Sequence, residues 1–152
     1  MVDIQQRTVA DIVDAPEFPA LIEEYAAESA IPGLPPPRAK IETYRTYEAM
    51  GIFHAFTAEQ AGALIGFITV VAPPMPHYSM PIAVSESFFV AAAHRKGGAG
   101  LRLLEMAEGR ARMLGAPGLL VSAPFEGRLF EVLPRRGYVE TSRIFFKRLY
   151  DA

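Results

Sequence analysis

The order of strand and helix patterns predicts an α/β protein whose central twisted sheet carries helices on both faces. Three segments rich in β-branched and aromatic residues follow one another between residues 52 and 91, which predicts a mostly antiparallel sheet there. Strand and helix patterns then alternate, so a mixed sheet is expected, with six to seven strands and about four helices. The length suits one core, and residues 1–152 are expected to form a single domain.

Helical signals dominate the first fifty residues, after a short strand pattern at residues 4–9. Thr8 and Asp11 have the spacing of a capping box, in which each residue satisfies a backbone N–H of the other. Apolar side chains then recur at helical spacing over residues 18–26. A second helix is expected over residues 38–50, where a glycine follows as a stop signal.

The middle of the chain reads as strands separated by loops. Residues 52–57 and 64–71 predict a hairpin, and residues 82–91 predict the next strand. Repeated prolines in residues 31–37 and 72–81 predict two loops, because proline cannot continue a helix or a central strand.

Strand and helix patterns alternate in the last third of the chain. Residues 101–114 have one apolar and one charged face, which predicts a helix packed on the core. A buried strand is expected at residues 118–123 and a short helix at 127–133. A final pair of strands is expected at residues 138–140 and 144–149.

Composition and charge narrow the function classes. The formal net charge of -2 argues against a nucleic-acid partner, which usually requires a basic excess. The absence of cysteine excludes disulfides and thiolate metal sites, and the three histidines lack metal-site spacing, so no metal is expected. The N-terminus lacks a secretion pattern and no apolar run is long enough to span a bilayer, so a soluble, cytoplasmic protein without a membrane partner is expected.

The strongest chemical signal is a turn of small residues between a strand and a helix. Residues 95–100 read Arg-Lys-Gly-Gly-Ala-Gly, and glycines let several backbone N–H groups approach an anion. The helix that follows adds the positive end of its dipole, so the turn predicts a pyrophosphate site. A P-loop motif is absent, and Leu103 occupies the third glycine position of a dinucleotide fingerprint.

This turn resembles the R/Q-x-x-G-x-G/A signature of GNAT acyltransferases of bacterial or prophage type. The step Arg136-Gly137-Tyr138 resembles the family's G-[FY] step before its last hairpin. The resemblance implies a GNAT-like fold and acetyl-coenzyme A as co-substrate, with its pyrophosphate on the turn and its pantetheine arm along the preceding strand. The cofactor-binding residues that it implies are Phe88, Phe89, Val90, Arg95, Lys96, Gly97, Gly98, Ala99 and Gly100.

Glu86 is the first candidate for the general base that takes a proton from the acceptor amine. Period-two alternation places it on one face with Phe88 and Val90, and a carboxylate on an apolar face is costly unless it is paired or hydrated. Members of the GNAT family often use an acidic residue on this strand. The alternative is a glutamate at a sheet edge that reaches solvent.

Many GNAT enzymes use a tyrosine to donate a proton to the leaving thiolate. The corresponding position in this sequence is Leu133 or Phe130, and neither side chain can donate a proton. Tyr138 is a weak candidate, and a core aromatic in the last hairpin is its alternative role. Ser122 and water are the other candidates, and a reaction that needs no general acid is the remaining alternative. On the second helix, Tyr44 and Tyr47 are candidates for the wall of the acceptor cleft, and simple packing is their alternative role.

The resemblance implies an N-acetyltransferase that acts on a small-molecule or peptide amine. The missing tyrosine leaves open a degenerate GNAT domain that binds acetyl-coenzyme A as a sensor or structural module. A binding module for another nucleotide is the third hypothesis. A homodimer is also consistent with the resemblance, while the acceptor and the length of the acyl group stay open.

Overall fold

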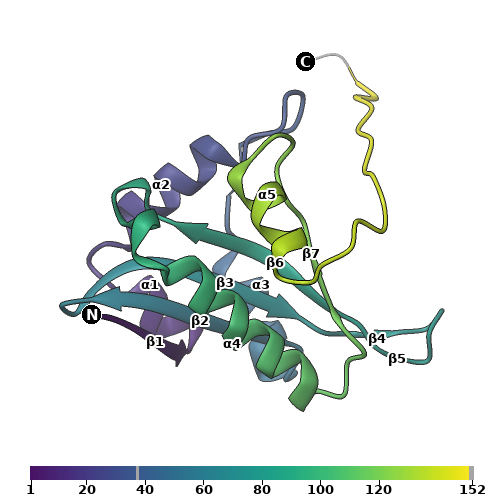
Figure 1. Ribbon diagram of the computed structural model, residues 1–152, viewed down its shortest axis with the longest axis horizontal. Coiled ribbons are helices and arrows are strands. Elements are labelled where there is room, and N and C mark those ends of the chain that lie inside the picture. Colours follow the sequence, from purple (N-terminus) through teal and green to yellow (C-terminus); the bar gives the residue numbers. More distant parts are fainter. Residues whose placement is uncertain (37, 151–152) are drawn as a thin grey trace.

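Five strands form one mixed sheet in the order β1-β2-β3-β6-β7 (Figure 1). The computed structural model describes residues 1–36 and 38–150. The strands are β1 (Val2–Arg7), β2 (Phe53–Gln60), β3 (Ala63–Val71), β6 (Ala83–Val90) and β7 (Leu119–Val121). Neighbouring strands are antiparallel except β6 and β7, which are parallel. The predicted α/β class with a mixed, mostly antiparallel sheet is confirmed, with five strands in the main sheet instead of six or seven.

Helices cover both faces of the sheet. On one face lie α1 (Val9–Val13), α2 (Phe18–Glu28) and α3 (Ile41–Ala49), and on the other lie α4 (Ala99–Met113) and α5 (Arg128–Arg135). A short 3-10 helix, η1 (Ala92–Gly97), connects β6 to α4. Among the residues that the structure describes, no helix has the length and apolar character needed to cross a membrane.

Two local structures that the sequence predicts are present in the fold, a capping box and a hairpin. The Thr8 hydroxyl accepts a hydrogen bond from the Asp11 backbone N–H at 3.1 Å, and the Asp11 carboxylate accepts one from the Thr8 backbone at 3.1 Å. This reciprocal pair is the expected capping box at the start of α1. The expected β2–β3 hairpin turns at Ala61 and Gly62, which both have positive φ, as a tight two-residue turn requires.

The face of the sheet covered by α4 holds the largest core. Four residues on the apolar face expected for this helix are buried: Leu103, Leu104, Ala107 and Ala111. They pack against Ile68 and Val70 of β3, which are also fully buried. The periodic apolar pattern therefore identified the packed face of this helix correctly.

The final pair of strands expected at residues 138–140 and 144–149 is wrong. The chain turns at Gly137, and residues 139–150 form no strand and run away from the sheet (Figure 1). Ile144 and Phe145, at the start of the second expected strand, are 86% and 89% exposed. A strand is stable only when a neighbour accepts and donates its backbone hydrogen bonds, and local propensity cannot supply that neighbour.

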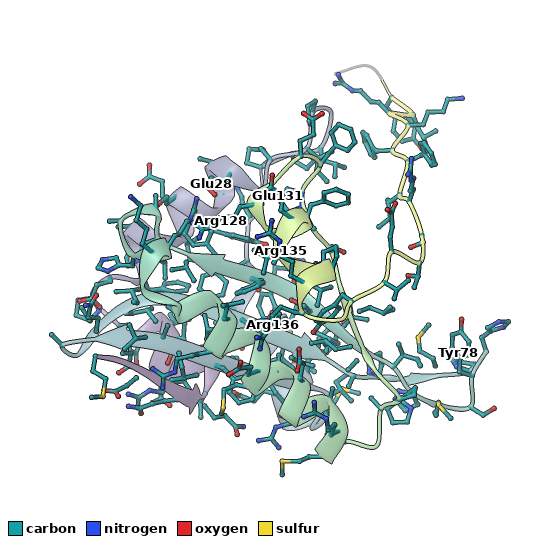
Figure 2. The ribbon with its side chains drawn as sticks, viewed as in Figure 1. Glu28, Tyr78, Arg128, Glu131, Arg135 and Arg136 are labelled. Atoms are coloured by element: carbon teal, nitrogen blue, oxygen red, sulfur yellow. The ribbon has the colours of Figure 1, made fainter. Side chains whose placement is uncertain are left out.

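The second proline-rich loop contains a small ribbon that the sequence did not predict. It consists of β4 (Pro74–Met75) and β5 (Met80–Pro81), paired antiparallel. Tyr78 lies at its tip, far from the body of the protein (Figure 2). Short strands of this kind tolerate proline because few ladder hydrogen bonds are needed.

Candidate functional site

The parallel strands β6 and β7 pair at only one end of β6. Residues 83–85 pair with Leu119–Val121, and no described strand lies beside residues 86–90 on that side. The strand that carries Val90 therefore separates from the next strand. An exposed length of strand edge can pair with an extended ligand in the way that it would pair with another strand.

The glycine-rich turn begins where this open length of β6 ends. Gly98 has a φ of 76° and stands immediately before α4, with no side-chain cap on the helix. The helix begins at Ala99, two residues earlier than expected, so Ala99 and Gly100 belong to its first turn. The first N–H groups of a helix have no partner within it, and together with the helix dipole they attract an anion.

Space for that anion is present beside the turn. A Cβ atom built at Gly97 or at Gly98 would meet nothing within 4 Å. The backbone at these two residues is therefore accessible from outside. This geometry fits a phosphate group that approaches the start of α4.

The side chain of Arg95 is engaged within the protein. Its Nε donates to the Val90 carbonyl at 2.8 Å, and its guanidinium forms an ion pair with Glu28 of α2 at 2.7 Å. It also lies over the Phe89 ring, 5.2 Å from the ring centre. The guanidinium thus connects the turn to α2, while the Arg95 backbone stays in the turn.

Glu86 lies at the point where β6 and β7 separate. Thr69 pairs with Ser87 and Val70 pairs with Ser85, so Glu86 is an extra residue in a β-bulge. A bulge reverses the alternation of faces, because one residue is added to a period of two.

The prediction that Glu86 shares a face with Phe88 and Val90 is wrong because of this bulge. Phe88 and Val90 pack against the core on the α4 side. Glu86 and Ser87 instead line a cavity on the side of α1, α2 and α3. The bulge therefore places the carboxylate beside a cavity and not within the apolar core.

The cavity has a volume of about 300 Å³ and is open to solvent. Most of its walls are hydrocarbon, from the three N-terminal helices and from β2 and β3. The lining residues are Val9, Ile12, Val13, Phe18, Ile22, Tyr25, Ala26, Arg38, Ala39, Ile41, Tyr44, Phe53, Phe67, Thr69, Glu86 and Ser87.

Two hydroxyl groups hold the Glu86 carboxylate. Tyr44 donates to one oxygen at 2.9 Å, and Thr69 donates to the other at 3.1 Å. Among the described residues, none of the ion pairs includes Glu86. The two neutral hydroxyl groups therefore orient the carboxylate without neutralising its charge, which can pair with a cation.

Tyr44 and Tyr25 are both held in the protonated form. Burial, followed by the negative charge of Glu86, raises the pKa of Tyr44 well above its usual range, and the same two causes raise the pKa of Tyr25. Protonated phenols are hydrogen-bond donors at neutral pH. The surroundings of Glu86 therefore keep Tyr44 as a hydrogen-bond donor to its carboxylate.

The structure separates the two tyrosines that the sequence suggested for the acceptor wall. Tyr44 lines the cavity, whereas Tyr47 is not among its lining residues and is exposed. Tyr25 and Thr69 were missed as site residues. Tyr25 had only the helical spacing of an apolar face as a signal, and nothing in the sequence indicated that Thr69 would reach Glu86.

Tyr138 lies far from this arrangement. Its hydroxyl donates to Glu108 of α4 at 2.9 Å, and its ring packs against the core on the α4 side. Burial and the Glu108 carboxylate raise the pKa of Tyr138. The structure therefore does not bring Tyr138 together with Glu86.

The two residues at the family's usual tyrosine position are not among the described residues that line the cavity. Leu133 is buried in the core on the α4 side, and Phe130 is exposed. Neither side chain can donate a proton.

The histidines are dispersed. His54 lies within hydrogen-bond distance of the Gly51 carbonyl, His94 contacts the Gln60 amide, and His77 packs against Tyr78 at the tip of the ribbon. In the part of the chain that the structure describes, no three His, Asp or Glu side chains gather as a metal site would require.

Comparisons with known proteins agree with this geometry. The model of the acetyltransferase (GNAT) family matches residues 18–126. No curated protein sequence matches the chain.

Solved structures share the fold over almost the whole chain. A ribosomal-protein-alanine N-acetyltransferase from Brucella melitensis biovar Abortus 2308 is 20% identical with a TM-score of 0.73, covering 98% of this chain and 99% of that chain. The structure of AAC(6')-Iy with the bisubstrate analog CoA-S-monomethyl-acetylneamine is 20% identical with a TM-score of 0.75, covering 99% of each chain. An aminoglycoside acetyltransferase, meta-AAC0020, from an uncultured soil metagenomic sample with bound sisomicin is 18% identical with a TM-score of 0.72, covering 98% of this chain and 97% of that chain.

Proposed function

This chain belongs to the GNAT acetyltransferase family, and we propose that it transfers the acetyl group of acetyl-coenzyme A to a primary amine. The observation that carries the proposal is the position of Glu86. It stands where β6 and β7 separate and also lines the cavity under α1, α2 and α3. One carboxylate therefore faces both the opening in the sheet and a space for an acceptor.

Acetyl-coenzyme A supplies the acetyl group as a thioester. The first turn of α4 and the backbone of residues 95–100 bind the pyrophosphate, and residues 88–90 pair with the pantetheine arm. From Val90 back to Glu86 the strand covers about 13 Å, since each residue of a strand advances about 3.3 Å. The bound arm therefore runs from the turn toward the carboxylate.

Glu86 prepares the acceptor for attack. An amine enters as an ammonium ion, and Glu86 takes a proton from it directly or through one water molecule. The amine nitrogen then forms a bond to the acetyl carbon as the carbon–sulfur bond breaks. Tyr44 and Thr69 orient the carboxylate throughout. The nitrogen gives its remaining extra proton to solvent, which leaves the amide, and solvent protonates the departing sulfur.

A binding domain without turnover is the second candidate. It is favoured by the side chains at the family's usual tyrosine position, where Leu133 and Phe130 cannot donate a proton. This candidate predicts that acetyl-coenzyme A binds normally and that no amine accelerates the release of free thiol.

Thermal unfolding with acetyl-coenzyme A, ATP and NAD tests the cofactor. Ligand at about 100 times its dissociation constant should stabilise the protein by about 2.7 kcal/mol. For a chain of this size the melting temperature should rise by roughly 5–10 °C. A rise with acetyl-coenzyme A alone supports the proposal, and no rise with it at millimolar concentration would overturn it.

Thiol release with a panel of primary amines then separates the enzyme from the binding domain. Amine-dependent release, with the acetylated amine identified by mass spectrometry, supports transfer. A clear thermal shift without release for any class of amine would favour the binding domain.

A further inference from the structure

We infer that the acceptor is a small amine with one ammonium group and a compact apolar body. This inference rests on the proposed function, because it takes the cavity beside Glu86 as the acceptor site. Three features of the cavity support it: the walls are largely apolar, the volume is small, and one carboxylate and one cation are among the described lining residues.

The walls of the cavity are apolar on several sides. Ile12 of α1, Phe18 and Ile22 of α2, Phe53 of β2 and Phe67 of β3 all line it. Transfer of hydrocarbon surface from water to such walls is favourable, whereas a hydroxyl or amide placed against them would lose its hydrogen bonds to water. An acceptor with a hydrocarbon body therefore gains most from this site.

The size of the cavity favours a compact body. Its volume of about 300 Å³ lies at the lower end of small-molecule sites, which span roughly 300–1,000 Å³. One aromatic ring or a short branched chain suits this space. A sugar-based acceptor of several rings would extend far beyond it.

The charges in the cavity select a single ammonium group. Glu86 is the one carboxylate among the described lining residues, and Arg38 is the one cation. An ammonium group beside Glu86 gains an ion pair that no described side chain supplies. A second ammonium group would lie against hydrocarbon or nearer to Arg38, and both positions are unfavourable.

The single carboxylate and the apolar walls disfavour acceptors of higher charge or polarity. Sisomicin and polyamines carry several ammonium groups, so they are expected to be poor acceptors here. A peptide amine would bring polar backbone against apolar walls and is also expected to be poor.

The first experiment compares acceptors at saturating acetyl-coenzyme A. Benzylamine and isopentylamine are measured beside spermidine, sisomicin and an alanine-ended peptide. We expect kcat/KM for the apolar amines to exceed that of the others by about a hundredfold, the range of selection by hydrophobic pockets. Equal or better turnover of spermidine, sisomicin or the peptide would overturn the inference while leaving acetyl transfer intact.

A matched pair of variants on α2 tests whether this cavity holds the body of the acceptor. Ala26 lines the cavity, whereas the adjacent Ala27 is exposed and is not among the lining residues. Ala26→Leu should raise KM for benzylamine by about tenfold or more because it fills the cavity. Ala27→Leu should leave KM unchanged, and an equal effect of both variants would contradict the assignment.

Direct binding keeps the inference testable if turnover is not found. Titration calorimetry of benzylamine against the protein with coenzyme A should show binding that Ala26→Leu weakens and Ala27→Leu does not. No binding of benzylamine at millimolar concentration would overturn the inference, whatever the thermal shift with acetyl-coenzyme A. Stronger binding of phenylalanine that Arg38→Gln abolishes would also overturn it, in favour of a carboxylate-bearing acceptor.

Discussion

The two faces of the sheet are packed in different ways. On the α4 face, Ile68 and Leu103 are both 0% exposed and belong to one continuous core. On the face of α1, α2 and α3, the same strands border a cavity of about 300 Å³ that is open to solvent. The comparison indicates that core side chains fill the α4 face, whereas the face of α1, α2 and α3 leaves a space that a ligand could enter.

The bulge in β6 creates much of this difference. Ser85 and Val90 lie buried on β6, and Glu86 between them is exposed at the cavity. The one extra residue in the strand thus places the Glu86 carboxylate at the cavity and not on the face of the apolar residues Phe88 and Val90. Substitutions on the two faces should therefore affect different properties.

The largest effect is expected at Glu86. Glu86→Gln should lower kcat/KM by about 10²–10⁴-fold because the variant cannot take a proton. The free energy of unfolding should change by less than about 0.5 kcal/mol, since the side chain is exposed. Steady-state rates from pH about 6 to 9 and urea denaturation measure the two quantities.

The control for this change is Glu23→Gln on α2, an exposed glutamate outside the cavity lining, which should leave kcat/KM unaltered. Full activity of the Glu86 variant across the same pH range would remove the general-base role.

The opposite result is expected on the α4 face. Leu103→Ala should lower the free energy of unfolding by about 2–5 kcal/mol, because it leaves a cavity in a dense core. The exposed Leu101 on the same helix provides the matched control, and Leu101→Ala should cost much less. Urea denaturation measures both, and similar losses would contradict the assigned packed face.

A smaller effect is expected at the glycine turn between the two faces. Gly98 has a φ of 76°, so Gly98→Val should strain the backbone by about 1–3 kcal/mol. It should also weaken the binding of coenzyme A, because the new side chain occupies the space beside the turn. Thermal unfolding and titration calorimetry measure the two effects.

A variant at Gly115 distinguishes the effect of backbone strain from that of a side chain that blocks the coenzyme A site. It has the same φ of 76° and also meets nothing within 4 Å, but it lies after the other end of α4. Gly115→Val should cost similar stability and leave coenzyme A binding intact. Loss of binding in both variants would attribute the effect to strain.

The smallest effect is a pH dependence at His54 on β2. Burial, and then the positive charge of Arg110, lowers the pKa of His54 below the usual value of 6.5. His54 therefore binds a proton more readily in the unfolded chain than in the folded one. Above pH 6.5 the neutral His54 favours the folded state, and this contribution to stability is lost as the pH falls through the folded-state pKa.

His54→Gln should accordingly reduce the loss of stability between pH about 7.5 and 5.5. Urea denaturation of both proteins at these two values measures the difference. Identical pH dependence in the two proteins would contradict the role of His54.

Local interactions made most of the fold predictable. The capping box of Thr8 and Asp11, the β2–β3 hairpin and the inward face of α4 each depend on residues close in sequence. The glycine turn at residues 95–100 was predictable for the same reason. Its exact form, a 3-10 helix followed by α4 from Ala99, was not.

The last two strands were mispredicted because a strand is stabilised by a neighbouring strand that can lie far away in the sequence. The apolar pattern of residues 144–149 has the composition of a strand, but a strand requires a partner. β7 offers only three residues and pairs with β6. Pattern alone could not indicate that no partner would be reached.

By itself, the sequence determined the class of the fold, the turn at the start of α4 and the presence of an acidic residue on β6. Only the tertiary structure decided where that acid points and what surrounds it. Tyr44 and Glu86 are 42 residues apart in sequence, and the bulge depends on how β3 and β6 pair. Contacts of this kind arise when distant segments pack together, so no short stretch of the chain encodes them.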